Sequence, residues 1–63
     1  MTDEQRVNRY ILEVLAHHEA PLLALVGTGK WRIVTPSGSP ISDVAPTPLL
    51  AWRSAAEKVK LAA

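Results

Sequence analysis

Two adjacent histidines, His17 and His18, are the residues of this chain best suited by type to metal binding or proton transfer. Neighbouring positions on a helix point about 100° apart, so this pair cannot chelate one metal as residues four apart would. His18 continues the apolar side of the first predicted helix, which favours a core histidine that caps nearby carbonyl groups. His17 is expected to be solvated. The sequence therefore predicts no metal site.

The segment Gly27-Thr28-Gly29-Lys30 carries the glycine and lysine of a phosphate-binding loop. The full pattern also needs a glycine three residues before this segment and Ser or Thr after the lysine, where Ala24 and Trp31 stand. No helix is expected directly after the segment, so the helix dipole that holds a phosphate is missing. We interpret the segment as a hairpin turn.

Nucleophilic and acid–base catalysis find no support in the hydroxyl and carboxylate residues. The serines fall in predicted turns, at an edge or on a helix surface, away from histidine: Ser37, Ser39, Ser42 and Ser54. Asp3 and Glu4 suit a helix N-terminus, and the other acidic residues are expected in solvent or in turns. We therefore expect a protein that is not an enzyme and that holds no cofactor.

The composition of the chain excludes several classes of protein. The chain has 63 residues and no cysteine, with 7 Lys+Arg against 6 Asp+Glu, which excludes disulfide scaffolds, cysteine-based zinc folds and polybasic tails. Apolar residues make up 48% and charged residues 21%, the balance of a folded domain. A core in a chain this short supplies only about 3–5 kcal/mol. Oligomerisation or binding of a partner is therefore expected.

No targeting or membrane signal is visible in the sequence. The longest apolar run, Leu22 to Val26, is far shorter than the roughly 20 residues that a bilayer span needs. The first residues include Asp3 and Glu4 and lack the basic and apolar regions of a signal peptide. We expect a cytoplasmic protein without membrane contact.

The first predicted helix begins at about Asp3, because Thr2 to Gln5 has the form of a capping box. An apolar stripe with helical period follows: Val7, Tyr10, Ile11, Val14, Leu15 and His18. Pro21 stops this helix.

A β-hairpin is predicted next. The run 22–26 reads as a short strand buried on both faces or paired centrally, and residues 30–35 alternate as a second strand. A Pro-Ser-Gly-Ser turn at 36–39 leads to a third strand, from Pro40 to about Asp43 or Val44. Proline has no ladder donor, which places that strand at an edge.

The second predicted helix runs from about Pro48 to near the C-terminus, with Thr47 as its N-cap. Its main face is apolar: Leu49, Trp52, Ala55, Ala56, Val59 and Ala63. The opposite side is charged: Arg53, Glu57 and Lys60, with Arg53 and Glu57 spaced for an ion pair. Leu50 and Leu61 lie on another side with Ser54 between them.

These elements predict one α+β domain over residues 1–63, in the order αβββα, with both helices on one face of a short antiparallel sheet. We assign Trp31, Trp52, Ile11 and Leu15 to the core. The other sheet face is then uncovered and carries a basic, partly apolar set: Lys30, Arg32 and Val34.

The function class that this pattern favours is protein–protein interaction, through a homodimer, another protein or both. The predicted contact residues lie on the open sheet face and the second helix: Lys30, Arg32, Val34, Leu50, Arg53 and Leu61. The alternative is nucleic-acid binding by the basic sheet face, with Arg6, Arg9 or Arg53 nearby. Trp31 shares a face with Ile33, which favours its burial over stacking on bases.

Residues 31–41 combine a tryptophan-bearing strand with a Pro-x-Gly turn, and residues 47–56 form a helix start with Ala-Trp and then Ala-Ala. This arrangement of strand, turn and helix start resembles that of small bacteriophage or prophage accessory proteins. The resemblance implies a non-enzymatic protein that binds host proteins, such as regulators or antiphage defence complexes, including CRISPR machinery. It carries over no functional residue, because the shared positions are core and turns.

Overall fold

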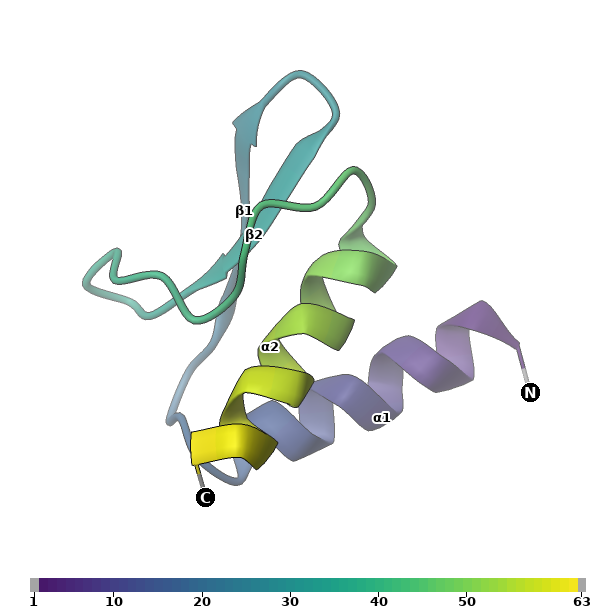
Figure 1. Ribbon diagram of the computed structural model, residues 1–63, viewed down its shortest axis with the longest axis vertical. Coiled ribbons are helices and arrows are strands. Elements are labelled where there is room, and N and C mark those ends of the chain that lie inside the picture. The colour runs from purple at the N-terminus through teal and green to yellow at the C-terminus, as the bar shows by residue number, and fades with distance from the viewer. Residues whose placement is uncertain (1, 63) are drawn as a thin grey trace.

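The computed structural model describes residues 2–62, which form two helices and a two-stranded antiparallel sheet. The elements are α1 (Asp3–Leu15), β1 (Leu22–Gly27), β2 (Lys30–Val34) and α2 (Pro48–Ala62). α2 packs against both α1 and β2 and so occupies the middle of the molecule (Figure 1). The α+β class is confirmed. The observed order is αββα, with one strand fewer than expected.

The hairpin turns through Thr28 and Gly29, and Gly29 has a φ of 65°, a left-handed conformation that glycine adopts without strain. The register pairs Leu23 with Ile33 and Leu25 with Trp31. It then shifts by one residue before Gly27, which makes an irregularity at the end of β1.

The third strand predicted at Pro40 to Val44 is wrong as a regular strand. Residues 40–45 do run beside β2, but within the described chain they make only two isolated bridges, Val34 to Pro40 and Trp31 to Ala45. The cause is Ser42, which is buried and whose Oγ accepts the Ile33 N–H at 2.8 Å in place of a backbone carbonyl. A side chain that occupies a ladder position interrupts the regular pairing.

α1 begins as predicted but ends early. The Thr2 N–H donates to Gln5 Oε1 at 2.9 Å and the Gln5 N–H donates to Thr2 Oγ1 at 3.2 Å, which confirms the capping box. The helix stops at Leu15, so His18 lies beyond it, contrary to expectation. Its N–H donates to the Val14 carbonyl in a closing turn, because the chain must reverse before Pro21 to reach β1.

α2 follows the prediction closely. The Leu50 N–H donates to Thr47 Oγ1 at 3.2 Å, so Thr47 is its N-cap. The expected apolar face is buried at Trp52 and Val59 and at the alanines between them, with Ala51 added. Ala63, which we assigned to this face, lies outside the described residues.

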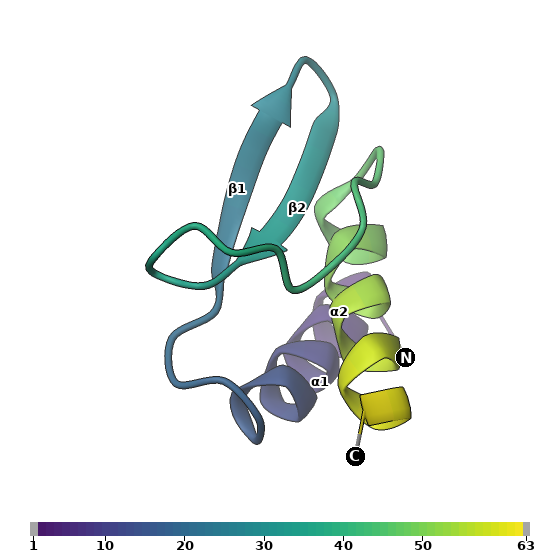
Figure 2. The same ribbon diagram turned by 60° about the vertical axis from the view of Figure 1, so that its left-hand side comes forward.

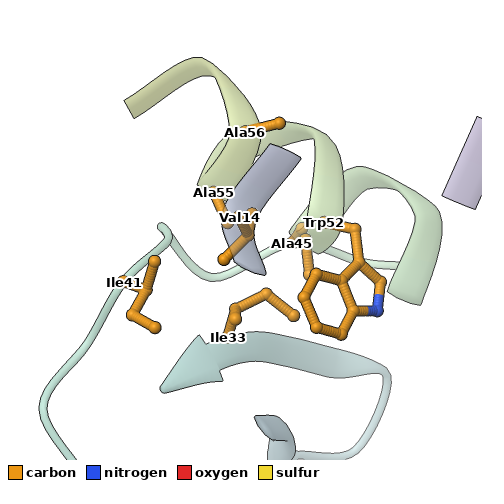
Figure 3. Close-up of a cluster of buried hydrophobic side chains, with 8 residues drawn as sticks. Val14, Ile33, Ile41, Ala45, Trp52, Ala55 and Ala56 are labelled. Atoms are coloured by element: carbon orange, nitrogen blue, oxygen red, sulfur yellow. The ribbon is translucent and has the colours of Figure 1, made fainter. Parts of the chain in front are cut away.

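The core forms where α1, α2, β2 and the 40–45 segment meet (Figure 3). Val14 and Ile33 are fully buried at its centre, and Trp52 is 7% exposed. Trp31 and Ile11 are half-buried and pack against this cluster, as expected. Leu15, which we assigned to the core, is 44% exposed.

Leu15 is exposed because α2 lies on the other flank of α1. The Lys60 Nζ of α2 lies 3.1 Å from Glu13 Oε1. Residues two apart on a helix point in nearly opposite directions, so Leu15 is turned away from α2. The apolar stripe is therefore wider than the contact that covers it.

Candidate protein-interaction surface

β1 consists of apolar residues and glycine, yet most of its side chains lie in solvent. Their exposed fractions are 49% for Leu22, 39% for Leu23, 61% for Leu25 and 47% for Val26. The prediction that this strand is buried on both faces or paired centrally is therefore wrong. The physical reason is position: α2 packs against β2, and residues 40–45 lie along the other edge of β2 (Figure 2). β1 is left at the outside.

The backbone of β2 is bonded on both sides. Trp31 exchanges two hydrogen bonds with Ala45, at 2.7 and 2.8 Å. The Ile33 carbonyl accepts the Ile41 N–H at 2.7 Å, and the Ile33 N–H donates to Ser42 Oγ. Both β2 residues therefore turn their backbone groups away from β1, toward the 40–45 segment.

The outer edge of β1 follows from this pattern. Backbone groups of successive residues in an antiparallel strand point to opposite sides, so Arg32 bonds to β1, where Ala24 is its partner. The residues on either side of Ala24 then direct their N–H and C=O groups outward. These are Leu23 and Leu25, and within residues 2–62 no strand lies on that side of β1.

α1 adds two further exposed leucines, Leu12 at 67% and Leu15 at 44%. Both lie on the flank that is turned away from α2. Residues 16–21 connect the C-terminal end of α1 to the start of β1 (Figures 1 and 2). We call the exposed apolar residues of the strand the β1 surface: Leu22, Leu23, Leu25 and Val26.

The predicted sheet residues lie on the hairpin face opposite the buried Ile33, as the alternation of the strand requires. Lys30 is exposed, whereas Arg32 and Val34 are half-buried. Their cross-strand partners include Ala24 and Leu22 of β1. This part of the predicted contact set therefore borders the β1 surface.

The residues predicted on α2 lie elsewhere. Leu50 is 38% exposed and Leu61 is 87% exposed, but Ser54 between them accepts the Asp43 N–H at 3.1 Å. The structure therefore places a loop contact between the two leucines. Arg53 lies in solvent, where its Nε is 3.1 Å from Glu57 Oε1. The α2 residues and the sheet residues are not brought together into one surface.

A groove of about 240 Å³ separates α1 from the end of α2. It is lined by charged residues and one tyrosine: Arg6, Arg9, Tyr10, Glu13 and Lys60. The arginines of α1 are thus gathered at the helix pair, whereas Lys30 and Arg32 lie on the hairpin. The basic residues named for nucleic-acid binding therefore lie in separate places, since Arg53 pairs with Glu57 on the exposed side of α2.

Within residues 2–62, no group of three or more potential ligand side chains is arranged to hold a metal ion. No helix in this part of the chain has the length and apolar character needed to cross a membrane. Comparisons with protein-family models, curated proteins and solved structures give no match. The geometry of the β1 surface therefore carries the functional argument.

Sequence reasoning missed the β1 surface because it took an apolar strand to be a buried one. A usable signal was present. Residues 2–62 form only two helices, which are too few to cover both faces of a sheet. Natural edge strands commonly carry a charge or proline that discourages pairing, and the exposed part of this one has neither.

Proposed function

We propose that this chain is a non-enzymatic protein-binding module that acts through the β1 surface. The observation that carries the proposal is the outer edge of β1, where Leu23 and Leu25 direct their backbone groups outward beside side chains 39% and 61% exposed. An edge of this kind accepts a further strand, with affinity from main-chain hydrogen bonds and specificity from the alternating side chains. Contiguous exposed apolar patches are typical of interaction sites.

The biological setting remains the one that the sequence resemblance implies. We propose that the module works in the cytoplasm of a bacterial host, against a host regulator or an antiphage defence complex. The support is the pattern of residues 31–41 and 47–56. The size of the chain agrees with this role, because a protein of 63 residues offers a surface more readily than a deep pocket.

Affinity capture from a bacterial lysate, with and without nuclease, tests the proposal. The tagged wild-type chain is compared with Leu25→Lys, which places a charge on the β1 surface at an exposed position. Leu61→Lys is the matched control, because it makes the same chemical change at an exposed position of α2. We expect a nuclease-resistant protein to be retained by the wild type and by Leu61→Lys and to be reduced at least about tenfold with Leu25→Lys.

Two results would contradict this function. Capture lost with Leu61→Lys and kept with Leu25→Lys would move the interface to α2. Capture that nuclease abolishes would favour the nucleic-acid alternative. In that case affinity for an oligonucleotide must fall steeply with salt, and Lys30→Ala must reduce the slope by about one.

A further inference from the structure

We propose that the partner of the β1 edge is a second copy of this chain, paired antiparallel through β1 about a two-fold axis at Ala24. This inference rests on the proposed function, that the β1 surface binds protein, and it makes the host protein a partner of the paired chains, whose β1 edges are already occupied by each other. It makes the two hairpins one four-stranded sheet in the order β2-β1-β1-β2. Each edge of the pair is then either bonded to its copy or bordered by residues 40–45.

The register follows from which backbone groups are available. Leu23 and Leu25 are the β1 residues that point outward, and an axis at Ala24 sets Leu23 of one copy opposite Leu25 of the other. Each such pair exchanges two N–H to C=O hydrogen bonds, so the symmetric contact contains about four. Pro21, which has no N–H, and the irregularity before Gly27 both fall outside this ladder.

Side-chain size supports the same axis. Ala24 would face its own copy as a non-hydrogen-bonded pair, in which the Cα atoms approach to about 4.5 Å. It is the smallest side chain in Leu22 to Val26, so the closest approach falls where the least volume must be accommodated. An axis at Leu23 would instead require Leu25 to pair with Pro21, which lacks one of the two hydrogen bonds.

A stable dimer of this chain needs a contact wider than the β1 strand itself. A standard interface takes about 800 Å² from each partner. That is close to one fifth of the 4199 Å² surface of this chain. A strand of six residues covers only part of this area, so the residues that flank β1 in each copy would contribute the rest.

The charges near the strand also suit an antiparallel copy. Residues 22–27 carry no charge, so no like charges meet along the ladder. Glu19 lies before the start of β1 and Lys30 lies opposite its end, and both are exposed. Antiparallel pairing brings the start of one copy's β1 beside the end of the other's, so Glu19 of one copy and Lys30 of the other, one strand further in, place opposite charges at both ends of the contact.

A cysteine scan tests the axis directly, because the natural chain has no cysteine. In Ala24→Cys the two introduced residues would lie opposite one another. Their Cα atoms would then be within the separation of about 4.4–6.8 Å that is usual for disulfides. Leu22→Cys is the matched control on the same face. Its two copies would lie about 13 Å apart along the strand direction, from about 3.3 Å per residue over four residues. We expect Ala24→Cys to form a disulfide-linked dimer on mild oxidation and Leu22→Cys to stay uncrosslinked.

Light scattering across a concentration series tests the association without crosslinking. We expect the wild type and Leu61→Lys to reach twice the 6.8 kDa chain mass. Leu25→Lys should raise the dissociation constant at least about tenfold while its circular dichroism stays that of the folded chain. A dimer that crosslinks through Leu22→Cys and not through Ala24→Cys would overturn the axis.

Different results would overturn the second copy as the partner and the function of the β1 surface. A wild type that stays at the monomer mass, with no crosslink at Ala24, overturns the second copy as the partner. If the same chain still captures another protein, and loses it with Leu25→Lys, the function of the β1 surface stands. If the monomer captures nothing, both are overturned.

Discussion

The two strands of the hairpin differ in exposure, and the difference is the opposite of what their sequences suggest. β1 has the more apolar sequence, yet its large side chains are 39% to 61% exposed. β2 carries Lys30 and Arg32, yet it contains Ile33, which is fully buried. The difference lies in their neighbours, because α2 and residues 40–45 both contact β2. Burial in this fold is set by which strand α2 reaches, and hydrophobicity alone does not identify that strand.

This difference divides the chain into a part that stabilises the fold and a part whose apolar side chains lie in solvent. The cluster around Ile33 and Val14 holds α1, α2 and β2 together. β1 is held by its ladder to β2 and contributes less to that cluster. Substitutions in the two strands should therefore separate effects on stability from effects on association.

Trp52→Ala should give the largest effect. Trp52 is 7% exposed in the core between α2 and β2, and removing a buried tryptophan side chain costs about 3–5 kcal/mol. That is comparable to the whole free energy of unfolding of a domain this small. Circular dichroism should show an unfolded chain at room temperature. A cooperative thermal transition like that of the wild type would reject the assignment of Trp52 to the core.

Ile33→Ala and Leu23→Ala compare the strands at one register position, since these residues are cross-strand partners. Ile33→Ala leaves a cavity in the centre of the core and should cost about 2–5 kcal/mol. Leu23 is 39% exposed, so Leu23→Ala should cost less than half as much in the monomer. Urea unfolding at low protein concentration measures both. Equal losses would show that β1 is as much a part of the core as β2.

Ser42→Ala should lower the free energy of unfolding by an intermediate amount, through the loss of a hydrogen bond to β2. The Ser42 Oγ accepts the buried Ile33 N–H at 2.8 Å, and its removal leaves that donor without a partner. Such a loss costs about 1–3 kcal/mol. Ser37→Ala is the control, because Ser37 is exposed in the 36–39 turn and its hydroxyl is hydrogen-bonded to the Thr35 hydroxyl at 2.9 Å. If both variants unfold at the same urea concentration, Ser42 does not replace a ladder acceptor.

Much of the fold was predictable because its signals are local. The Thr2–Gln5 capping box, the Thr47-Pro48 helix start and the Gly29 turn each depend on a few adjacent residues, and each is confirmed. The early end of α1 and the irregular 40–45 segment were not predicted. Both depend on contacts between distant parts of the chain, such as the Ser42 hydroxyl with Ile33.

The candidate site was predictable only in part, for the same reason. Alternation correctly placed Ile33 toward the helices, which puts Lys30 and Arg32 on the other face. The exposure of β1 was not predictable from its composition, since an apolar pentapeptide has the same sequence whether it lies at the centre or at the edge of a sheet. Only the position of α2 over β2 decides between them.

The smallest expected effect is a difference in hydrogen-exchange rate between two neighbouring residues of β1. The Ala24 N–H lies in the ladder to β2, whereas the Leu25 N–H points to the outer edge, so the two neighbours should differ within a single strand. One hydrogen bond is worth about 0.5–1.5 kcal/mol, which corresponds to an exchange rate up to about tenfold slower at Ala24 in the monomer. Raising the protein concentration should slow exchange at Leu23 and Leu25 and leave Ala24 nearly unchanged, because the proposed second copy would bond only the outward groups. Equal protection of Ala24 and Leu25 in a dilute, monomeric sample would show that the outer edge already has a partner within its own chain.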